Sequence, residues 1–143
     1  MTPLIAADPD GFALWTAKQL KGYEKSLAPK IDARKIALEP LGKFGNHTFQ
    51  IAHREGSGEA ELHETQADLF IVQSGEATLV VGGTIPGSRA SAPNEVRGPS
   101  IEGGEKKKLG PGDVVHIPPK VPHQLLLDSG KQFTYAIMKV DSK

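Results

Sequence analysis

Acidic side chains and a histidine alternate along one short segment of the sequence. In "EAELH", Glu59, Glu61 and His63 are spaced two residues apart, and Asp68 follows immediately before the apolar run "LFIV". Residues two apart on a β-strand point to the same face, so these groups would line one side of a strand, and Asp68 would share a face with Phe70. Turned inward, that face would need a metal ion or an arginine, because an unpaired buried carboxylate costs several kcal/mol. Turned outward, it would be the solvated side of an edge strand.

A further histidine lies in a segment with the pattern of a turn, a strand, a bend and a second strand. This segment, "GPGDVVHIPPKVPHQLLL", runs from Gly110 to Leu127. A Gly-Asp turn opens the first strand, and the proline-rich bend delivers His123 onto the next one. The chain has no cysteine, which excludes disulfides, thiolate ligands and a cysteine nucleophile. Any metal ion must therefore be held by nitrogen and oxygen.

The elements that would position these groups are mostly short β-strands. From Arg34 onward, segments rich in Val, Ile, Phe and Thr alternate with Gly, Pro, Asn and Ser clusters, which is typical of an antiparallel sandwich or barrel. We expect strands near residues 34–39, 47–54, 59–64, 68–73, 76–82, 113–117, 123–127 and 132–140. Residues 83–110 carry few large apolar side chains and are expected to form a long excursion. The predicted inner face consists of Phe70, Val72, Leu79, Val81, Val114, Ile117, Leu125 and Ile137.

A short amphipathic helix is expected ahead of the strands, at about residues 8–28. Its stripe is formed by residues three or four apart, namely Phe12, Thr16, Leu20, Tyr23 and Leu27. Asp8 or Asp10 would cap this helix, and Pro29 would end it. We expect the helix to pack outside a barrel at about 34–140, within one domain spanning 1–143.

The composition excludes some classes of partner. The chain has 143 residues, of which 38% are hydrophobic, and its 17 basic residues balance 17 acidic ones. This balance gives no indication of binding to nucleic acid or a membrane surface. Apolar runs are interrupted well before the roughly 20 residues needed to cross a bilayer, and no signal sequence opens the chain. We therefore expect a cytoplasmic protein.

The second polar segment resembles one of the two sequence motifs of the cupin superfamily. That motif has a glycine, five residues, a proline, a short bend and a histidine, which Gly112, Pro118 and His123 match. Lys120 stands where the motif usually has another glycine, and Leu127 stands where it often has asparagine.

The first polar segment resembles the other cupin motif, which reads histidine, any residue, histidine, three or four residues, glutamate, six residues and glycine. Counting back from Gly75 places Asp68 in the glutamate position, His63 in the second histidine position and Glu61 in the first. Only His63 and Gly75 match strictly. The resemblance covers roughly residues 44–140.

The resemblance implies an all-β fold, a small antiparallel jelly-roll barrel. In cupins the inward residues of both motifs converge on one site, so Glu61, His63, Asp68 and His123 would bind a divalent transition metal ion. Two imidazoles and two carboxylates suit zinc, iron, manganese or nickel. Because aspartate is one methylene shorter than glutamate, Asp68 either binds the ion or orients a ligand from behind it.

Other residues are expected near this site or elsewhere in the fold. Gln66 or Glu64 could replace Asp68 as a ligand. A bound small molecule would contact His47, Gln66 and Phe70. A buried histidine bonded to its surroundings is the more common role for His53.

The implied function is broad, because cupin barrels host oxygenases, isomerases, lyases, storage proteins and sensing modules. The leading hypothesis is a metal-binding protein, acting as a metal-dependent enzyme on a small molecule. The alternatives are a non-catalytic module that binds or senses a small ligand, and a metal-free structural cupin. The resemblance and the apolar stripe of the helix also predict a homodimer.

Overall fold

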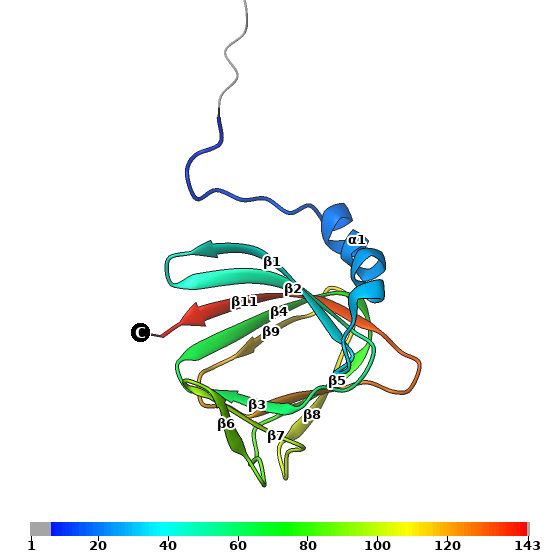
Figure 1. Cartoon of the computed structure of the whole chain (residues 1–143), viewed down its shortest axis with the longest axis vertical. Coiled ribbons are helices and arrows are strands. Elements are labelled where there is room, and N and C mark those ends of the chain that lie inside the picture. Colours follow the sequence, from blue (N-terminus) through cyan, green and yellow to red (C-terminus); the bar gives the residue numbers. More distant parts are fainter. Residues whose placement is uncertain (1–6, 143) are drawn as a thin grey trace, which may run out of the picture.

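Two antiparallel β-sheets face each other, and one short helix lies outside them (Figure 1). The computed structural model describes residues 7–142. Within that range, eleven strands form one sheet of five strands and one of six. The predicted all-β jelly-roll with an N-terminal helix is confirmed.

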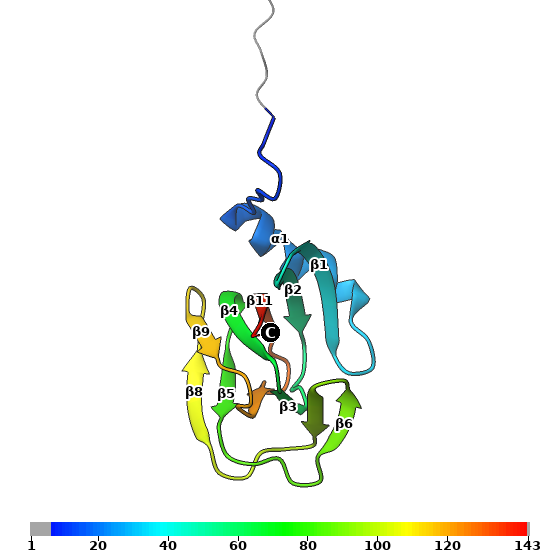
Figure 2. The same cartoon turned by 90° about the vertical axis from the view of Figure 1, so that its left-hand side faces the viewer.

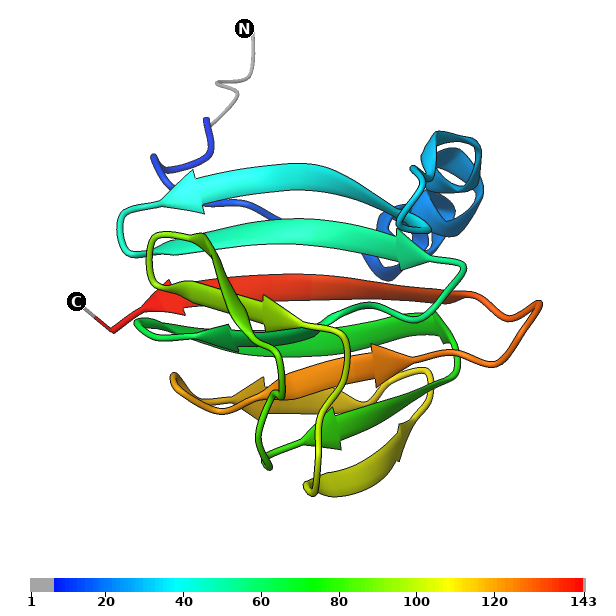
Figure 3. The same cartoon turned by 60° about the horizontal axis from the view of Figure 1, so that its bottom comes forward.

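The five-stranded sheet has the order β1-β2-β11-β4-β9. Its strands are β1 (Ile36–Phe44), β2 (His47–Arg54), β4 (Gln66–Gly75), β9 (Val114–Ile117) and β11 (Phe133–Asp141). Figure 3 shows the long strands β1, β2 and β11, coloured cyan to red, running side by side. Pro40 interrupts the ladder at a register shift on β1, which is tolerated because β1 lies at the sheet edge.

The six-stranded sheet has the order β6-β7-β3-β10-β5-β8. Its strands are β3 (Ala60–His63), β5 (Ala77–Val81), β6 (Arg89–Ala92), β7 (Glu95–Gly98), β8 (Glu105–Leu109) and β10 (His123–Leu126). Figure 2 shows β8 and β6 at opposite edges of this sheet.

Three of these strands fall inside the segment 83–110, which the sequence predicts as an excursion. Strand β6 is exposed along its whole length, and β8 carries the exposed run Lys106–Lys108. Lysines on an edge strand discourage pairing with another chain. Because the side chains of β6 and β8 are exposed, these strands show no apolar alternation in the sequence. The list of expected strands contains none in this segment, and in that respect the prediction is wrong.

The helix α1 (Ala17–Leu27) begins later than the sequence predicts. Thr16 is its N-cap: its Oγ1 accepts a hydrogen bond from Gln19 N (3.1 Å), and Gln19 Oε1 accepts one from Thr16 N (2.8 Å). This reciprocal capping box starts the helix, so neither Asp8 nor Asp10 caps it. A 3-10 turn, η1 (Ala28–Lys30), follows and contains Pro29.

The core has two parts. The larger lies between the sheets and contains Phe70, Val72, Leu79, Ile117, Leu125, Phe133 and Ile137. The smaller joins Leu27 of α1 to the outer face of the five-stranded sheet through Ala37, Ile51 and Ala136. The helix thus packs outside the barrel, as predicted.

Most of the predicted inner-face residues are buried, with two exceptions. Val81 is only partly buried, and Val114 is 67% exposed. Val115 and Ile117 both pack inward, and alternation then turns Val114 outward. The prediction for Val114 is therefore wrong.

Two further expectations concern surfaces. No helix within residues 7–142 is long and apolar enough to cross a membrane. Phe12 and Leu14, ahead of the helix, are 56% and 68% exposed. The homodimer stays a prediction, which sedimentation at micromolar concentration would test.

Candidate metal centre

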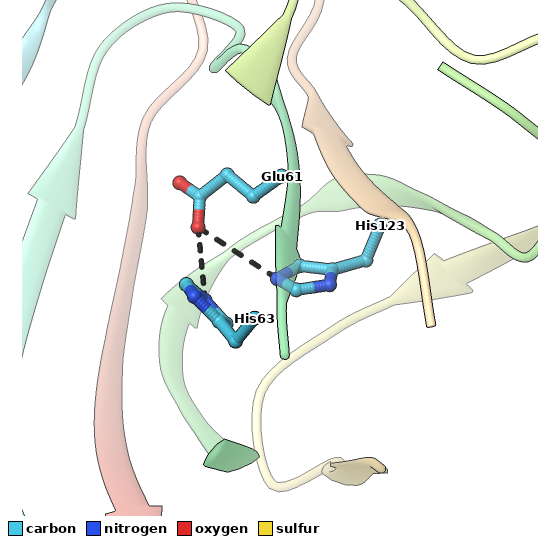
Figure 4. A group of neighbouring side chains, drawn as sticks. All are labelled: Glu61, His63 and His123. Carbon is cyan, nitrogen blue, oxygen red and sulfur yellow. Dashed lines mark ion pairs between the residues drawn. The ribbon is translucent and has the colours of Figure 1, made fainter. Parts of the chain in front are cut away.

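Three potential metal ligands come together inside the barrel from two paired strands. Glu61 and His63 lie on β3, and His123 opens β10, where it pairs with Glu61. Their ligand atoms all lie within 4.8 Å of one another. Figure 4 shows the Glu61 carboxylate facing both rings, with its Oε2 atom 3.2 Å from His63 Nε2 and 3.7 Å from His123 Nε2.

The His123 ring is oriented by the backbone. Its Nδ1 lies 3.0 Å from the carbonyl oxygen of Val121, which can only accept, so Nδ1 carries a proton and donates it. In the neutral ring, Nε2 then carries the lone pair. This Nε2 atom is buried and has no hydrogen-bond partner among the described residues. Asp68 Oδ2 lies 3.3 Å away, but the two atoms lack the alignment of a hydrogen bond.

Asp68 lies beside this group and is bound by a lysine. Its Oδ2 atom is 3.1 Å from His63 Nε2, while its Oδ1 accepts a hydrogen bond from Lys139 Nζ at 3.0 Å. Lys139 pairs with Asp68 across β4 and β11, and its Nζ also lies 3.4 Å from His63 Nε2. One oxygen of Asp68 is thus occupied by an ammonium group, and the other contacts both histidines.

Strand β7 adds two charged residues behind the ligands. Arg97 Nη1 lies 3.2 Å from Glu61 Oε1, and Arg97 Nε donates to Glu95 Oε1 at 2.7 Å. Glu95 Oε2 in turn lies 3.7 Å from His63 Nδ1. Arg97 thus orients the Glu61 carboxylate, while Glu95 places a negative charge behind the His63 ring without a hydrogen bond to it.

These charges shift the titration of the central groups. Burial lowers the pKa of His123, but Asp68 and Glu61 outweigh it and raise that pKa to about 9. Burial also opposes ionisation of the carboxylates, yet the histidines hold the pKa of Glu61 and of Asp68 well below its usual range. Without metal, the cluster therefore binds a proton between ionised carboxylates.

This proton makes the stability of the metal-free protein depend on pH. A group with a raised pKa in the folded state stabilises the fold below its unfolded pKa, and the contribution is lost as pH rises through the folded pKa. For His123, which rises from 6.5 to about 9, we expect the free energy of unfolding to decrease between those pH values. Urea unfolding at pH intervals measures this decrease. It should be much smaller in His123→Gln and retained in His116→Gln, whereas a flat wild-type profile would contradict it.

The three predicted small-molecule contacts are placed differently. Phe70 lines the same cavity of about 370 Å³ as Glu61, His63, Asp68 and His123, and its ring lies 6.5 Å from that of His123. Gln66 lies beyond His63 at the barrel end, where it donates to Asp141 Oδ1. His47 is on the outer face of β2, stacked on Phe44 beside Trp15. Neither Gln66 nor His47 lines the cavity. Alternation along β2 turns His47 outward.

The remaining histidines lie outside the site. His53 is 1% exposed, with Nδ1 2.8 Å from Thr134 Oγ1 and Nε2 2.8 Å from Glu55 Oε2. It faces outward from β2 and is a satisfied buried histidine. His116 is exposed on β9.

The backbone explains one departure from the motif. Lys120 has a φ of 67°, the left-handed conformation that a glycine adopts readily. Its N–H donates to His63 O at 2.7 Å, so this turn links the segment before β10 to β3. The chain therefore keeps the glycine conformation with a different side chain.

Several residues of the site were missed from the sequence. Glu95 and Arg97 alternate on β7 after a turn at Asn94, which has a φ of 61°, so "PNEVRG" carries a weak hairpin signal. Lys139 shares a face with Tyr135 and Ile137 on β11, and only this shared face indicates that it points inward.

Solved structures with this fold differ widely in sequence. TT1209 from Thermus thermophilus is 18% identical, with a TM-score of 0.58 over 82% of this chain and 92% of its own. The DMSP lyase DddQ from Ruegeria pomeroyi is 17% identical, with a TM-score of 0.54 over 74% of this chain and 47% of its own. The nucleoside dehydratase Pac13, from Streptomyces, is 12% identical, with a TM-score of 0.55 over 77% and 72%.

At these identities, the similarity establishes the fold alone. No protein-family profile and no curated protein sequence matches the chain. The topology, the two motif segments and these neighbours together show that this chain has the cupin fold.

Proposed function

We propose that this chain binds a divalent transition metal ion through Glu61, His63 and His123 and acts on a small molecule held in the barrel. The observation that carries the proposal is the buried Nε2 atom of His123, which has no hydrogen-bond partner among the described residues. Such an atom is rare in a folded protein, and a bound ion would satisfy it in place of the proton that the metal-free cluster holds there. It faces the carboxylate of Glu61 and the ring of His63, which also suit a metal ion.

The donor set limits the ion. Imidazole and carboxylate bind zinc, iron, manganese and nickel, and no sulfur ligand favours a softer ion. Such an ion, when bound, acts as a Lewis acid that polarises an oxygen atom of the small molecule. Lys139 would give up its 3.4 Å contact with His63 Nε2 and keep Asp68 Oδ1, which its flexible side chain allows.

The surrounding residues would bind and orient the small molecule. Phe70 forms an apolar wall next to His123. Asp68 faces the cavity and is ionised, so it would accept a proton from the small molecule. Two of the solved structures with this fold are a lyase and a dehydratase, which supports a reaction on a small molecule rather than a structural role.

A second candidate is a metal-free module that binds a small ligand without chemistry. It is favoured by Lys139, whose ammonium contacts Asp68 and His63 where a metal ion would otherwise supply positive charge. With one proton on the histidines, Lys139 and Arg97 would neutralise Glu61, Asp68 and Glu95.

Elemental analysis separates these candidates. Protein purified without chelator should contain close to one transition metal ion per chain, and protein stripped with chelator should regain one ion on titration. Binding should release protons, because the ion displaces the proton on His123. A purified protein that contains no metal and binds none would favour the metal-free module.

A further inference from the structure

Arg54 is a buried cation of the cavity without an acidic partner among the described residues. It is 8% exposed, at the end of β2, and its side chain lines the cavity. Within residues 7–142, its Nε donates to Tyr135 Oη at 3.0 Å, and no carboxylate lies within ion-pair distance of its guanidinium. The other inward cations are paired: Lys139 with Asp68, and Arg97 with Glu61.

An unpaired buried guanidinium is costly unless a ligand neutralises it. Buried charges in proteins are normally paired and hydrogen-bonded, because their transfer from water costs several kcal/mol. The chain also leaves space for this group at Gly58, where a Cβ atom would lie 2.7 Å from Arg54 Nη1 and 2.9 Å from Nη2. A glycine thus accommodates an arginine whose terminal nitrogens, Nη1 and Nη2, donate to no described residue.

We propose that Arg54 and Tyr135 bind the carboxylate of a small monocarboxylate in this cavity. This inference rests on the proposed function only in taking the cavity as the ligand-binding site, whereas the contact between Arg54 and a carboxylate does not depend on a metal ion. The two Nη groups form a planar fork that matches both oxygens of a carboxylate. Tyr135 accepts from Arg54 Nε and retains its own proton to donate. Burial raises the pKa of Tyr135, so this proton is kept at neutral pH.

The position of Arg54 defines the rest of the ligand. Tyr135 and Lys139 lie four residues apart on β11, which is about 13 Å along the strand, and Ile137 lies between them. Phe70 bridges the two ends, with its ring 5.1 Å from Tyr135 and 6.5 Å from His123. A ligand with its carboxylate at Arg54 would therefore place an apolar body against Phe70 and Ile137, toward the candidate metal ligands.

A single charge favours a carboxylate over a phosphate ester. Among the described residues, Arg54 supplies one buried and unpaired positive charge at this end of the cavity, because Arg34 at the rim is paired with Asp32, and this charge balances a carboxylate. A phosphate monoester carries up to two negative charges and would need a second cation, whereas Lys139 and Arg97 are already paired at the other end.

Calorimetric titration of the full chain tests this inference. The probes are butyrate and benzoate, their neutral amides butyramide and benzamide, and methyl phosphate, each with metal-stripped and metal-loaded protein. We expect the carboxylates to bind wild-type protein at least about tenfold more tightly than the amides or methyl phosphate, since a charged hydrogen-bond pair is lost with the amides. Arg54→Gln should weaken carboxylate binding by about tenfold or more without changing metal content.

The control is Arg34→Gln, which removes an arginine from the cavity rim. The Arg34 side chain is 69% exposed and already pairs with Asp32, so this change should leave carboxylate affinity within about twofold of wild type. Gly58→Ala supplies a second variant in case Arg54→Gln does not fold. It keeps every charge but displaces the guanidinium, and it should weaken carboxylate binding to a similar extent.

The outcomes separate this inference from the proposed function. Carboxylate affinity that is unchanged in folded Arg54→Gln or Gly58→Ala, or equal to amide affinity in wild type, would overturn the role of Arg54. Preference for methyl phosphate would overturn the carboxylate class. A chain that binds no metal but binds carboxylates through Arg54 would support this inference and refute the metal site. A chain that binds metal, and whose carboxylate affinity does not depend on Arg54, would support the metal site and refute the role of Arg54.

Discussion

Replacing His123 with alanine is expected to remove nearly all bound metal while leaving the barrel folded. Structural zinc sites in small domains contribute about 10–16 kcal/mol over roughly four ligands, so one lost imidazole should weaken binding by about 100- to 1,000-fold. The fold should survive because the main apolar core lies between the sheets and includes Phe133 and Ile117, at 0% and 1% exposed. Metal content after dialysis and circular dichroism measure the two effects.

Two companion variants make this result specific. His116→Ala removes an exposed histidine of β9 and should retain full metal content. Asp68→Asn should weaken metal binding by only about 10- to 100-fold. Asp68 has one oxygen bound to Lys139, so it would orient the histidine ligands rather than bind the ion. A loss as large as that of His123→Ala would make Asp68 a ligand. Full metal occupancy in His123→Ala would refute the metal site.

The parts of the site that could be predicted from sequence are those with a fixed local spacing. Glu61 and His63 are two apart on one strand, and His123 follows a proline bend, so each position could be inferred from its own segment. Gly75 and Gly112 both have positive φ, which explains why the motif needs glycine there. The alternation of Asp68, Phe70 and Val72 on one buried face could likewise be inferred from the sequence.

The parts that could not be predicted depend on contacts between distant segments. Arg54 ends a strand and precedes "EGSG", so its local pattern favours a solvent-exposed turn. Only pairing of β2 with β11 places it beside Tyr135. Strands β6 and β8 lie at the sheet edges with exposed polar residues, so they lack the hydrophobic alternation that marks a strand with one buried face. Strand β7 lies inside the sheet, but it carries the charged residues Glu95 and Arg97 and lacks that signal too.

The glycine that aligns the first motif is expected to tolerate substitution poorly. Gly75 ends β4 with a φ of 81°, and a Cβ atom there would overlap the backbone carbonyl oxygen of Gln132. Gly75→Ala would force an L-residue into the left-handed region, which costs about 1–2 kcal/mol. It would also push apart two backbone segments, which move less easily than the end of a side chain. With an overpacking cost of about 1–3 kcal/mol added, the free energy of unfolding should fall by about 2–5 kcal/mol.

Gly130→Ala separates the two causes. Gly130 has nearly the same φ, 78°, in the turn before β11, but a Cβ atom there would meet no heavy atom within 4 Å. Its loss of stability should therefore be limited to the conformational cost of about 1–2 kcal/mol. Chemical denaturation of both variants gives the difference, which isolates the contact with Gln132. Equal losses in the two variants would show that Gly75 is required for its φ alone, and that the close approach of β4 to the segment before β11 does not constrain the barrel.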